Sequence, residues 1–195
     1  MSGLRDERAA TFMERRRPGP SRPEAYRYLA ALIACPYLYL GLTSRTGLGV
    51  FTARPVAAGA VVVVDEDGTL RRRALPLAAA LAQGWDQAHD LFQIDHDLFL
   101  PPRGCFDDLF NHSCEPSGGW RLTEAGARFL AIRDLAAGEE LTYDYSCHLL
   151  GLGERMTCAC GTSACRALIG PFHDLPRPLQ ARYRRLGVVS PALAA

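Results

Sequence analysis

Three cysteines crowd into one short segment in the last quarter of the chain. Cys158, Cys160 and Cys165 lie within eight residues. Thiolates are preferred ligands of structural zinc, which takes four ligands in a tetrahedron. Three close thiols therefore predict a zinc site with one ligand still to be supplied from elsewhere. The candidates for that fourth position are Cys105, Cys114, Cys147 and His148.

The single asparagine of the chain lies in a second polar cluster. Asn111 is followed by His112, Ser113 and Cys114. An amide offers two donors and an acceptor, and an imidazole adds a flat polar surface. The cluster is thus a candidate site for a polar small molecule. An asparagine in a turn beside a buried histidine would give the same pattern, so the cluster alone does not decide.

Two tyrosines and two glycines complete the residues that could carry chemistry. If the chain is extended from Leu141 to Tyr145, Tyr143 and Tyr145 project from the same face. Such a pair could line a narrow aromatic channel, although paired tyrosines are more often packing residues. Gly47 and Gly49 would let the backbone approach a ligand closely, but a lone Gly-X-Gly pattern is weak evidence.

Short strands are the elements expected to position these residues. β-Branched and apolar runs between turn signals predict strands, and Val61–Val64 is expected to be a buried one. Helices are predicted over residues 74–91 and Tyr26–Cys35. The sum is a mainly β protein (β-rich α+β), without the βαβ alternation of a doubly wound sheet. The remaining predicted strands are Tyr37–Leu40, Gly49–Thr52, two within Leu91–Leu100, Phe129–Ile132 and Glu140–Tyr143.

Composition narrows the class of protein. The chain has 195 residues, a net charge of +1 and 48% hydrophobic residues, which predicts an ordinary globular domain. The balanced charge argues against a protein-wide attraction to nucleic acid or membranes. Seven cysteines without a secretory signal predict a reducing compartment, and hence a cytoplasmic protein, or a nuclear one in a eukaryote. All 22 basic residues are arginine, so the chain contains no lysine.

Along the chain the four motifs come in the order glycines, Asn111 cluster, tyrosines and cysteines. Together and in that order they resemble SET-domain protein lysine methyltransferases with a cysteine-rich post-SET segment. The resemblance runs from about Tyr37 to Pro176, and Cys165–Phe172 is similar to the family's post-SET ending. It implies a SET fold of several small sheets with a knot-like C-terminal threading, one of the rare exceptions to unthreaded chains. The expected organisation is a flexible Arg/Pro-rich arm (1–24), a SET domain (25–146), a zinc-binding post-SET segment (147–176) and a C-terminal tail (177–195).

The resemblance also implies roles for individual residues. Tyr145 matches the tyrosine whose hydroxyl lies beside the transferring methyl group. Tyr143 matches a position where tyrosine usually accompanies mono- or dimethylation. Cys114 matches the fourth ligand of a structural Zn²⁺, beside Cys158, Cys160 and Cys165. The residues implied to bind S-adenosylmethionine are Gly47, Leu48, Gly49, Asn111, His112, Tyr145 and Phe172.

Such chemistry suits tyrosines better than carboxylates. The amine of a lysine must lose a proton before it attacks a methyl sulfonium, and its free pKa is about 10.4. A narrow apolar channel and the sulfonium charge both lower that pKa. Catalysis is then mainly positioning and desolvation.

Two departures from the family pattern leave other functions open. Ser117 stands where the family usually has asparagine, and Asp108 where it often has arginine. An alternative is therefore a catalytically weak or inactive SET and zinc module that binds a partner peptide. A third reading is a small zinc-ribbon-like nucleic-acid binder that uses the N-terminal arm, but the near-neutral charge counts against direct nucleic-acid binding.

The expected partner is a lysine-bearing protein. Between Asp86 and Asp108, six aspartates stand against Arg103 alone. That stretch could attract a basic tail, such as that of a histone-like or ribosomal protein. A solvated acidic face is an equally good interpretation, and the oligomeric state is left open.

Overall fold

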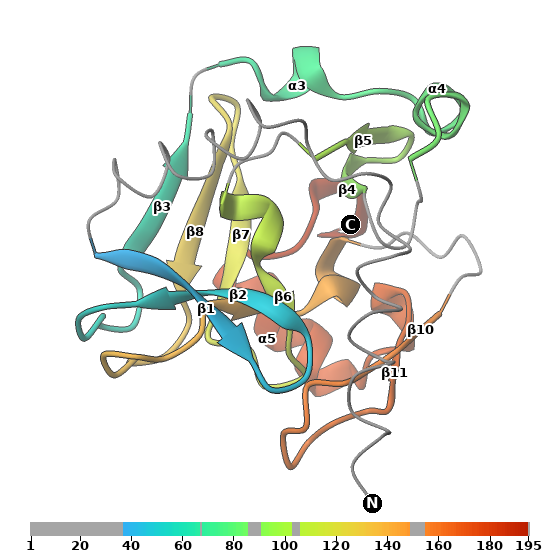
Figure 1. The fold of residues 1–195 in the computed structure, drawn as a ribbon. Coiled ribbons are helices and arrows are strands. Elements are labelled where there is room, and N and C mark those ends of the chain that lie inside the picture. Colours follow the sequence, from blue (N-terminus) through green and yellow to red (C-terminus); the bar gives the residue numbers. More distant parts are fainter. Residues whose placement is uncertain (1–36, 67, 86–90, 103–105, 149–154, 195) are drawn as a thin grey trace, which may run out of the picture.

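The computed structural model describes residues 37–66, 68–85, 91–102, 106–148 and 155–194. Small sheets and short helices make up these ranges, which confirms the mainly β prediction (Figure 1). The N-terminal arm and the helix expected over Tyr26–Cys35 lie outside the described residues. No helix within the described ranges is long and apolar enough to cross a bilayer.

The first sheet is a hairpin. Strands β1 (Leu38–Thr43) and β2 (Gly47–Thr52) pair in antiparallel register, with Thr43 opposite Gly47. The turn between them is closed by the backbone N–H of Thr46, which donates to the Thr43 hydroxyl at 2.9 Å. Gly47 has a backbone φ of 83°, a value that residues other than glycine rarely adopt. The two expected strands and their turn are therefore confirmed.

The central sheet has the strand order β3 (Val61–Asp65), β8 (Ala127–Ala131), β7 (Gly118–Leu122). The predicted Val61–Val64 strand is present, but it is buried only in part, because the side chains of Val61 and Val64 are 44% and 60% exposed. β3 is an edge strand, and a register shift lies between Val61 and Val63. Such a shift lets the neighbours Val62 and Val63 both face the core.

The helix expected over residues 74–91 is much shorter. Helix α4 covers only Leu77–Ala82, after a single turn, α3 (Leu70–Arg73). Leu75 cannot join it, because its backbone pairs with Phe99 as an isolated bridge. Gly84, with a φ of 82°, follows the end of α4, and residues 86–90 lie outside the described ranges.

Two further pairs of strands lie near the candidate site. β4 (Phe92–Asp95) and β5 (Leu98–Leu100) are antiparallel, which confirms the pair expected within Leu91–Leu100.

β6 (Asn111–His112) follows the 3-10 helix η1 (Phe106–Leu109) and runs parallel to β9 (Thr142–Tyr143). The extended stretch expected to reach Tyr145 ends at Tyr143, because Tyr145 opens the 3-10 helix η2 (Tyr145–His148). The knot-like threading stays a prediction.

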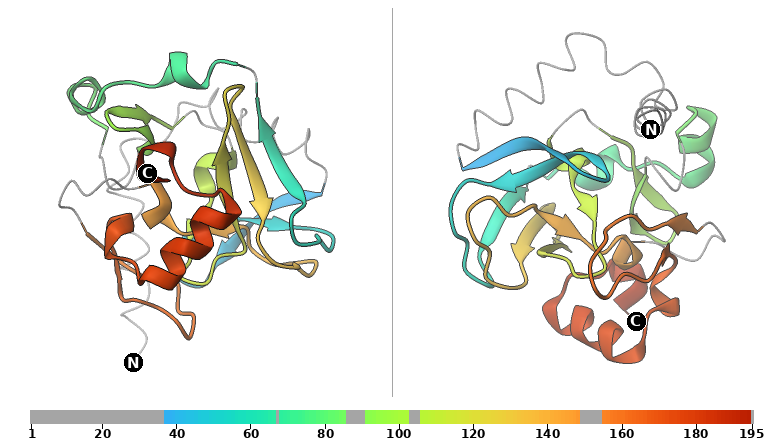
Figure 2. Two further views of the ribbon diagram at one scale, coloured as in Figure 1. Left: turned by 180° about the vertical axis from the view of Figure 1, so that it is seen from behind. Right: turned by 60° about the horizontal axis from the view of Figure 1, so that its bottom comes forward.

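Side chains are buried in two main clusters. The larger one lies within the central sheet and its neighbours and includes Val50, Phe129 and Leu141, all fully buried. The second gathers Cys147, Phe172 and Tyr183 at the C-terminal end. Figure 2 shows the C-terminal helices, in red, beside the central sheet. The elements of this end are β10 (Met156–Thr157), β11 (Leu168–Ile169), η3 (Phe172–Asp174), α5 (Arg177–Leu186) and α6 (Pro191–Ala194).

Candidate functional site

Asn111 joins three segments of the chain. Its side-chain nitrogen donates to the backbone carbonyl of Leu48 at 3.0 Å and to the carboxylate of Glu140 at 2.7 Å. The parallel pairing of Asn111 with Thr142 fixes its position along β9. The structure therefore brings the predicted glycine-rich strand and the lone asparagine together, as the resemblance implied.

A side chain at Gly49 would fit only if the ends of two neighbouring side chains moved. A Cβ atom there would lie 2.3 Å from the Glu140 carboxylate and 3.0 Å from the Asn111 amide nitrogen. Gly49 is buried, whereas its neighbour Leu48 is 47% exposed. The crowding leaves backbone, amide and carboxylate polar groups close together. The Asn111 amide uses both of its N–H groups in these bonds, so the oxygens that remain are acceptors and suit a ligand group that carries N–H donors.

Glu140 is a residue that the sequence analysis did not single out. It is half-buried, and this burial raises the pKa of its carboxyl, although the hydrogen bond from Asn111 acts in the opposite direction. The sequence shows that Glu140 immediately precedes the tyrosine segment that begins at Leu141. Its contact with Asn111 is not visible there, because 29 residues separate the two.

The two predicted catalytic tyrosines are in contact. The ring centroids of Tyr143 and Tyr145 are 4.7 Å apart, and the Tyr145 hydroxyl donates to the carbonyl of Phe110 at 2.8 Å. The rings of Phe92 and His148 lie 6.1 Å and 6.0 Å from that of Tyr143. Burial raises the pKa of Tyr143 well above its usual value, and the charge of Tyr145 adds to the effect. The phenol of Tyr143 is therefore neutral at neutral pH.

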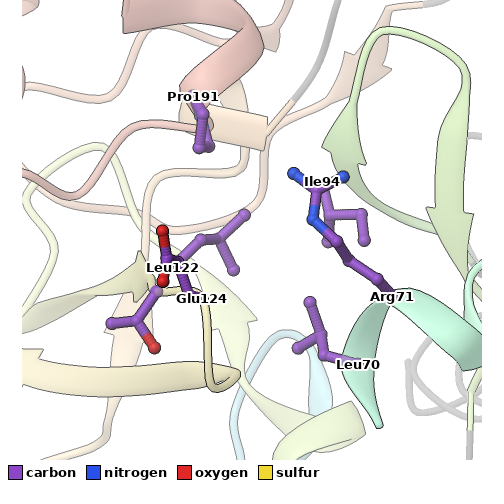
Figure 3. A pocket seen from close by; sticks show the side chains of 7 residues that line it. Leu70, Arg71, Ile94, Leu122, Glu124 and Pro191 are labelled. Atoms are coloured by element: carbon purple, nitrogen blue, oxygen red, sulfur yellow. The ribbon is translucent and has the colours of Figure 1, made fainter. Parts of the chain in front are cut away.

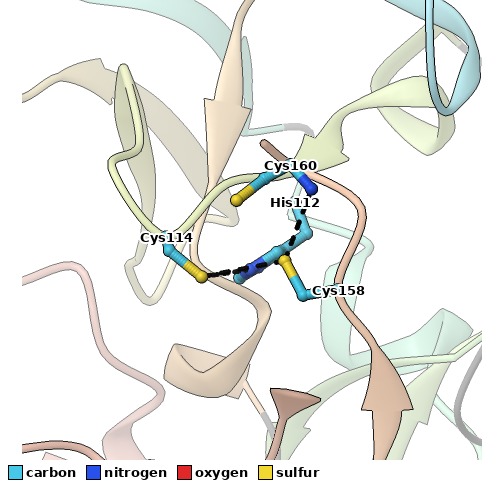
Figure 4. Close-up of side chains that lie close together, drawn as sticks. All are labelled: His112, Cys114, Cys158 and Cys160. Carbon is cyan, nitrogen blue, oxygen red and sulfur yellow. Dashed lines mark hydrogen bonds between the residues drawn. The ribbon is translucent and has the colours of Figure 1, made fainter. Parts of the chain in front are cut away.

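Sulfur and nitrogen atoms from four side chains gather in a cluster (Figure 4). Donor atoms of His112, Cys114, Cys158 and Cys160 all lie within 4.8 Å of one another. The sulfurs of Cys114 and Cys158 are 3.7 Å apart. Tetrahedral zinc with Zn–S bonds of about 2.3 Å needs sulfurs about 3.8 Å apart. The cluster therefore fits the zinc ion that the sequence predicts.

The surroundings shift the pKa values of the three clustered thiols in different directions, because burial raises those of Cys114 and Cys158. Burial raises the pKa of Cys160, but hydrogen bonds from Thr162 and from its neighbours outweigh burial and lower it to about 6. Cys160 is therefore the thiol of this cluster that loses its proton most readily. Cys165, the remaining predicted ligand, interacts with the thiol of Cys158. All of these cysteines are free, so no disulfide competes for them.

His112 has its side chain in this cluster. Its Nδ1 accepts the backbone N–H of Tyr145 at 3.2 Å, so in the neutral ring the proton is on Nε2. Nε2 lies 3.3 Å from the sulfur of Cys114. Burial lowers the pKa of His112 to about 4, although the Asp144 charge opposes it. The four close donor atoms therefore include the ring of His112 in the place that the sequence analysis gave to Cys165.

The two departures from the family pattern have identifiable contacts. Ser117 is buried, and its hydroxyl oxygen accepts the backbone N–H of Thr142 at 2.7 Å. It therefore anchors the strand that carries Tyr143. Asp108 lies in η1, and its negative charge contributes to raising the pKa of Tyr143.

The last predicted cofactor contact lies in the C-terminal core. Phe172 is 1% exposed and packs with Cys147 and Tyr183. The guanidinium of Arg184 lies 4.9 Å above its ring. Its contact with a cofactor stays a prediction.

A cavity of about 320 Å³ opens at a different place (Figure 3). It lies between α3, β4, the β7–β8 turn and the start of α6. None of the site residues predicted from the sequence lines it, so it is not the site described above. Its lining residues are Leu70, Arg71, Ile94, Leu122, Thr123, Glu124 and Pro191.

Comparison with known proteins gives a consistent picture. The sequence pattern of the SET domain family matches residues 47–146, which are 100 of the 195 residues. The chain is 30% identical over 146 residues to "Histone-lysine N-methyltransferase ash1" of Drosophila melanogaster, covering 72% of this chain and 7% of that protein. It is 30% identical over 145 residues to "Histone-lysine N-methyltransferase ATX2" of Arabidopsis thaliana, covering 68% of this chain and 13% of that protein.

A solved structure has the same fold. The methyltransferase domain of human "Histone-lysine N-methyltransferase SETMAR" aligns with a TM-score of 0.53 and 20% identity. The alignment covers 69% of this chain and 58% of that one. The chain therefore spans only a small part of the curated relatives and just over half of this structural neighbour.

Proposed function

Because the chain belongs to the SET-domain family, we propose that it is a protein-lysine N-methyltransferase that uses S-adenosylmethionine. The observation that carries this proposal is the convergence of Gly49, Asn111 and the tyrosine pair from three separate segments. Curated relatives named as histone-lysine methyltransferases support the same reaction class.

In this proposal one edge of the site holds the methyl donor. Bound there, S-adenosylmethionine supplies an electrophilic methyl group on a sulfonium. The backbone at Gly47, Leu48 and Gly49 and the Asn111 amide hold its polar end. The backbone of His112 contributes as well, since its ring faces the cysteines. Tyr145 and Phe172 are the other proposed contacts.

The tyrosine pair receives the lysine side chain. Tyr143, Tyr145 and the neighbouring Phe92 ring exclude water, which favours the neutral, nucleophilic amine. The hydroxyl of Tyr145 is anchored on the Phe110 carbonyl and is therefore held in one orientation. Attack then depends on alignment rather than on a strong general base. The hydroxyl of Tyr143 takes up space beside the amine, so mono- or dimethylation is the proposed outcome.

A structural zinc ion joins the post-SET segment to the rest of the site. The proposed ligands are Cys114, Cys158, Cys160 and Cys165. Cys114 lies two residues after the end of β6, so the metal would hold the segment 147–176 against the SET domain, 25–146. Free thiols and a zinc site are both compatible with a reducing compartment.

The proposed substrate is a lysine-bearing tail of a histone-like protein. The names of the relatives, which are histone-lysine methyltransferases, support this substrate, whereas attraction by the acidic stretch receives less support. Asp95 pairs with Arg71 at 3.1 Å, and Asp97 accepts the backbone N–H of Leu77. Asp86 and Asp90 lie outside the described residues.

The test combines cofactor binding with methyl transfer. Calorimetry should detect S-adenosylmethionine binding to the wild type and a large loss in Asn111→Ala. Tyr145→Phe should bind the cofactor but transfer methyl groups to histone peptides far more slowly. Because the chain has no lysine, every methyl-lysine found in the mixture must come from the substrate.

The alternative is an inactive module that keeps the fold and binds a peptide. The acidic Asp108, at a position where the family often has arginine, favours it. Absence of cofactor binding by the wild type, with binding of a histone peptide retained, would select this alternative.

A further inference from the structure

A buried carboxylate lies between the two tyrosines in the sequence. Asp144 is 2% exposed. One of its oxygens accepts the guanidinium of Arg166 at 2.8 Å and the backbone N–H of Ser146 at 3.1 Å. The other oxygen accepts the hydroxyl of Tyr183 at 3.1 Å. Donors from the post-SET segment and from α5 thus hold one side chain.

Tyr183 comes from a part of the chain that the SET domain pattern does not cover. It lies on α5, beyond the matched residues 47–146, in the segment described above as a tail. It is 1% exposed and is the buried residue of that helix. Its ring packs in the C-terminal core, while its hydroxyl leaves that core to reach Asp144.

We propose that Tyr183 is a positioning residue for the methyl-transfer site and acts through Asp144 on Tyr145. This inference rests on the proposed function. Asp144 precedes Tyr145 directly, and the backbone N–H of Tyr145 donates to His112. The Asp144 carboxylate also accepts the backbone N–H of Ser146 in η2, so a change in its orientation would move the start of η2 and with it Tyr145. Helix α5 then contributes to the geometry of the methyl-transfer site through Tyr183.

The physical reason is the cost of a poorly satisfied buried charge. A buried carboxylate that loses one of its donors rotates or draws in water, because an unpaired buried acceptor is unfavourable. The rotation would change the Arg166 contact on the other oxygen and the backbone at Tyr145. A shift of about 1 Å in a reacting group costs up to about 100-fold in rate.

The experiment compares Tyr183→Phe with Val188→Ala. Phenylalanine keeps the ring in the C-terminal core and removes only the hydroxyl. Val188 is buried in the same core and packs against Gly119, so its truncation destabilises the core without touching Asp144. Both full-length variants are assayed for kcat, KM for a histone peptide, cofactor affinity, zinc content and melting temperature.

The expected result is a fall of about 10- to 100-fold in kcat for Tyr183→Phe. Its cofactor affinity should stay within about twofold, since the Asn111 side of the site is intact. Val188→Ala should lose melting temperature while kcat is retained. Unchanged kcat in Tyr183→Phe, or an equal fall in both variants, would overturn the proposal.

A second measurement does not depend on turnover. Hydrogen exchange of the Tyr145 amide, followed by NMR, should become faster in Tyr183→Phe than in Val188→Ala, relative to global stability. If wild-type protein transfers no methyl group, the proposed function fails by itself. The exchange result still decides whether Tyr183 positions Tyr145, and equal exchange in both variants would reject it.

Discussion

The side chains of Asn111 and Glu140 form a hydrogen bond of 2.7 Å across two strand segments that are 29 residues apart. The same amide nitrogen also reaches the carbonyl of Leu48. One asparagine thus holds the glycine-rich strand, β6 and the start of the tyrosine segment in a fixed relation. The half-buried Glu140 carboxylate leaves a negative charge at the place proposed for the cofactor's ammonium group.

That charge predicts a pH-dependent effect of Glu140→Gln on stability. Burial raises the folded-state pKa of Glu140 above its usual 4.5. The folded state therefore favours the protonated form, and stability is lost as the pH rises through the folded-state pKa. Without cofactor, Glu140→Gln should melt at a higher temperature than wild type at pH 7. The difference should shrink below pH 4.5, where both side chains are neutral.

Glu139→Gln is the matched control for this pH effect. Glu139 pairs with Arg133 at 3.0 Å and accepts the backbone N–H of Ala136. Removing its charge should lower the melting temperature slightly or leave it unchanged. A lower melting temperature for Glu140→Gln at pH 7 that disappears below pH 4.5 would show that the charge stabilises the fold instead.

Gly49→Ala should weaken cofactor binding more than it weakens folding. The new Cβ would displace the ends of the flexible Glu140 and Asn111 side chains, which can move. We expect affinity for S-adenosylmethionine to fall at least about tenfold, or about 1.4 kcal/mol, in calorimetry. The double variant Gly49→Ala, Glu140→Ala removes the closest clash and should recover the melting temperature of Glu140→Ala alone. If the melting temperature of the double variant is not recovered, the strain lies in the backbone at position 49.

Cys165→Ser should release the metal. If His112 donates its Nε2 proton to the Cys114 sulfur, Cys165 must be the fourth ligand. Protein purified with zinc and passed over a chelator should retain one ion in wild type and much less in Cys165→Ser. Cys147→Ser is the control, because Cys147 is buried in the C-terminal core, apart from the metal cluster. Full zinc retention by Cys165→Ser would make His112 the ligand.

Local patterns explain what the sequence could predict. The β1–β2 hairpin and the β4–β5 pair depend on neighbouring residues, so their turn signals sufficed. The helix over residues 74–91 was overestimated because Leu75 is used in a pairing with Phe99. Helix α5 was missed because its sequence is largely polar and arginine-rich, with Tyr183 as its buried residue.

The residues of the site also fall into those that the sequence could predict and those that it could not. The motif residues were identified from their order along the chain, which the family pattern preserves. Glu140, Asp144 and Tyr183 were not, because their importance comes from contacts over 29 and 39 residues. A charged residue beside a motif gives no sign of whether it is buried, and only the fold supplies its partners.

Ser117→Ala tests whether the departure from the family's asparagine has a structural reason. The Ser117 hydroxyl accepts the Thr142 N–H at 2.7 Å in a buried setting. Alanine would leave that N–H without its partner, which costs about 1–3 kcal/mol. Denaturant unfolding should show this loss, whereas the exposed Ser163→Ala should stay within about 0.5 kcal/mol of wild type. Because Thr142 pairs with Asn111 across β6 and β9, cofactor affinity should fall with stability in Ser117→Ala. Loss of stability without loss of affinity would mean that this anchor serves the fold alone.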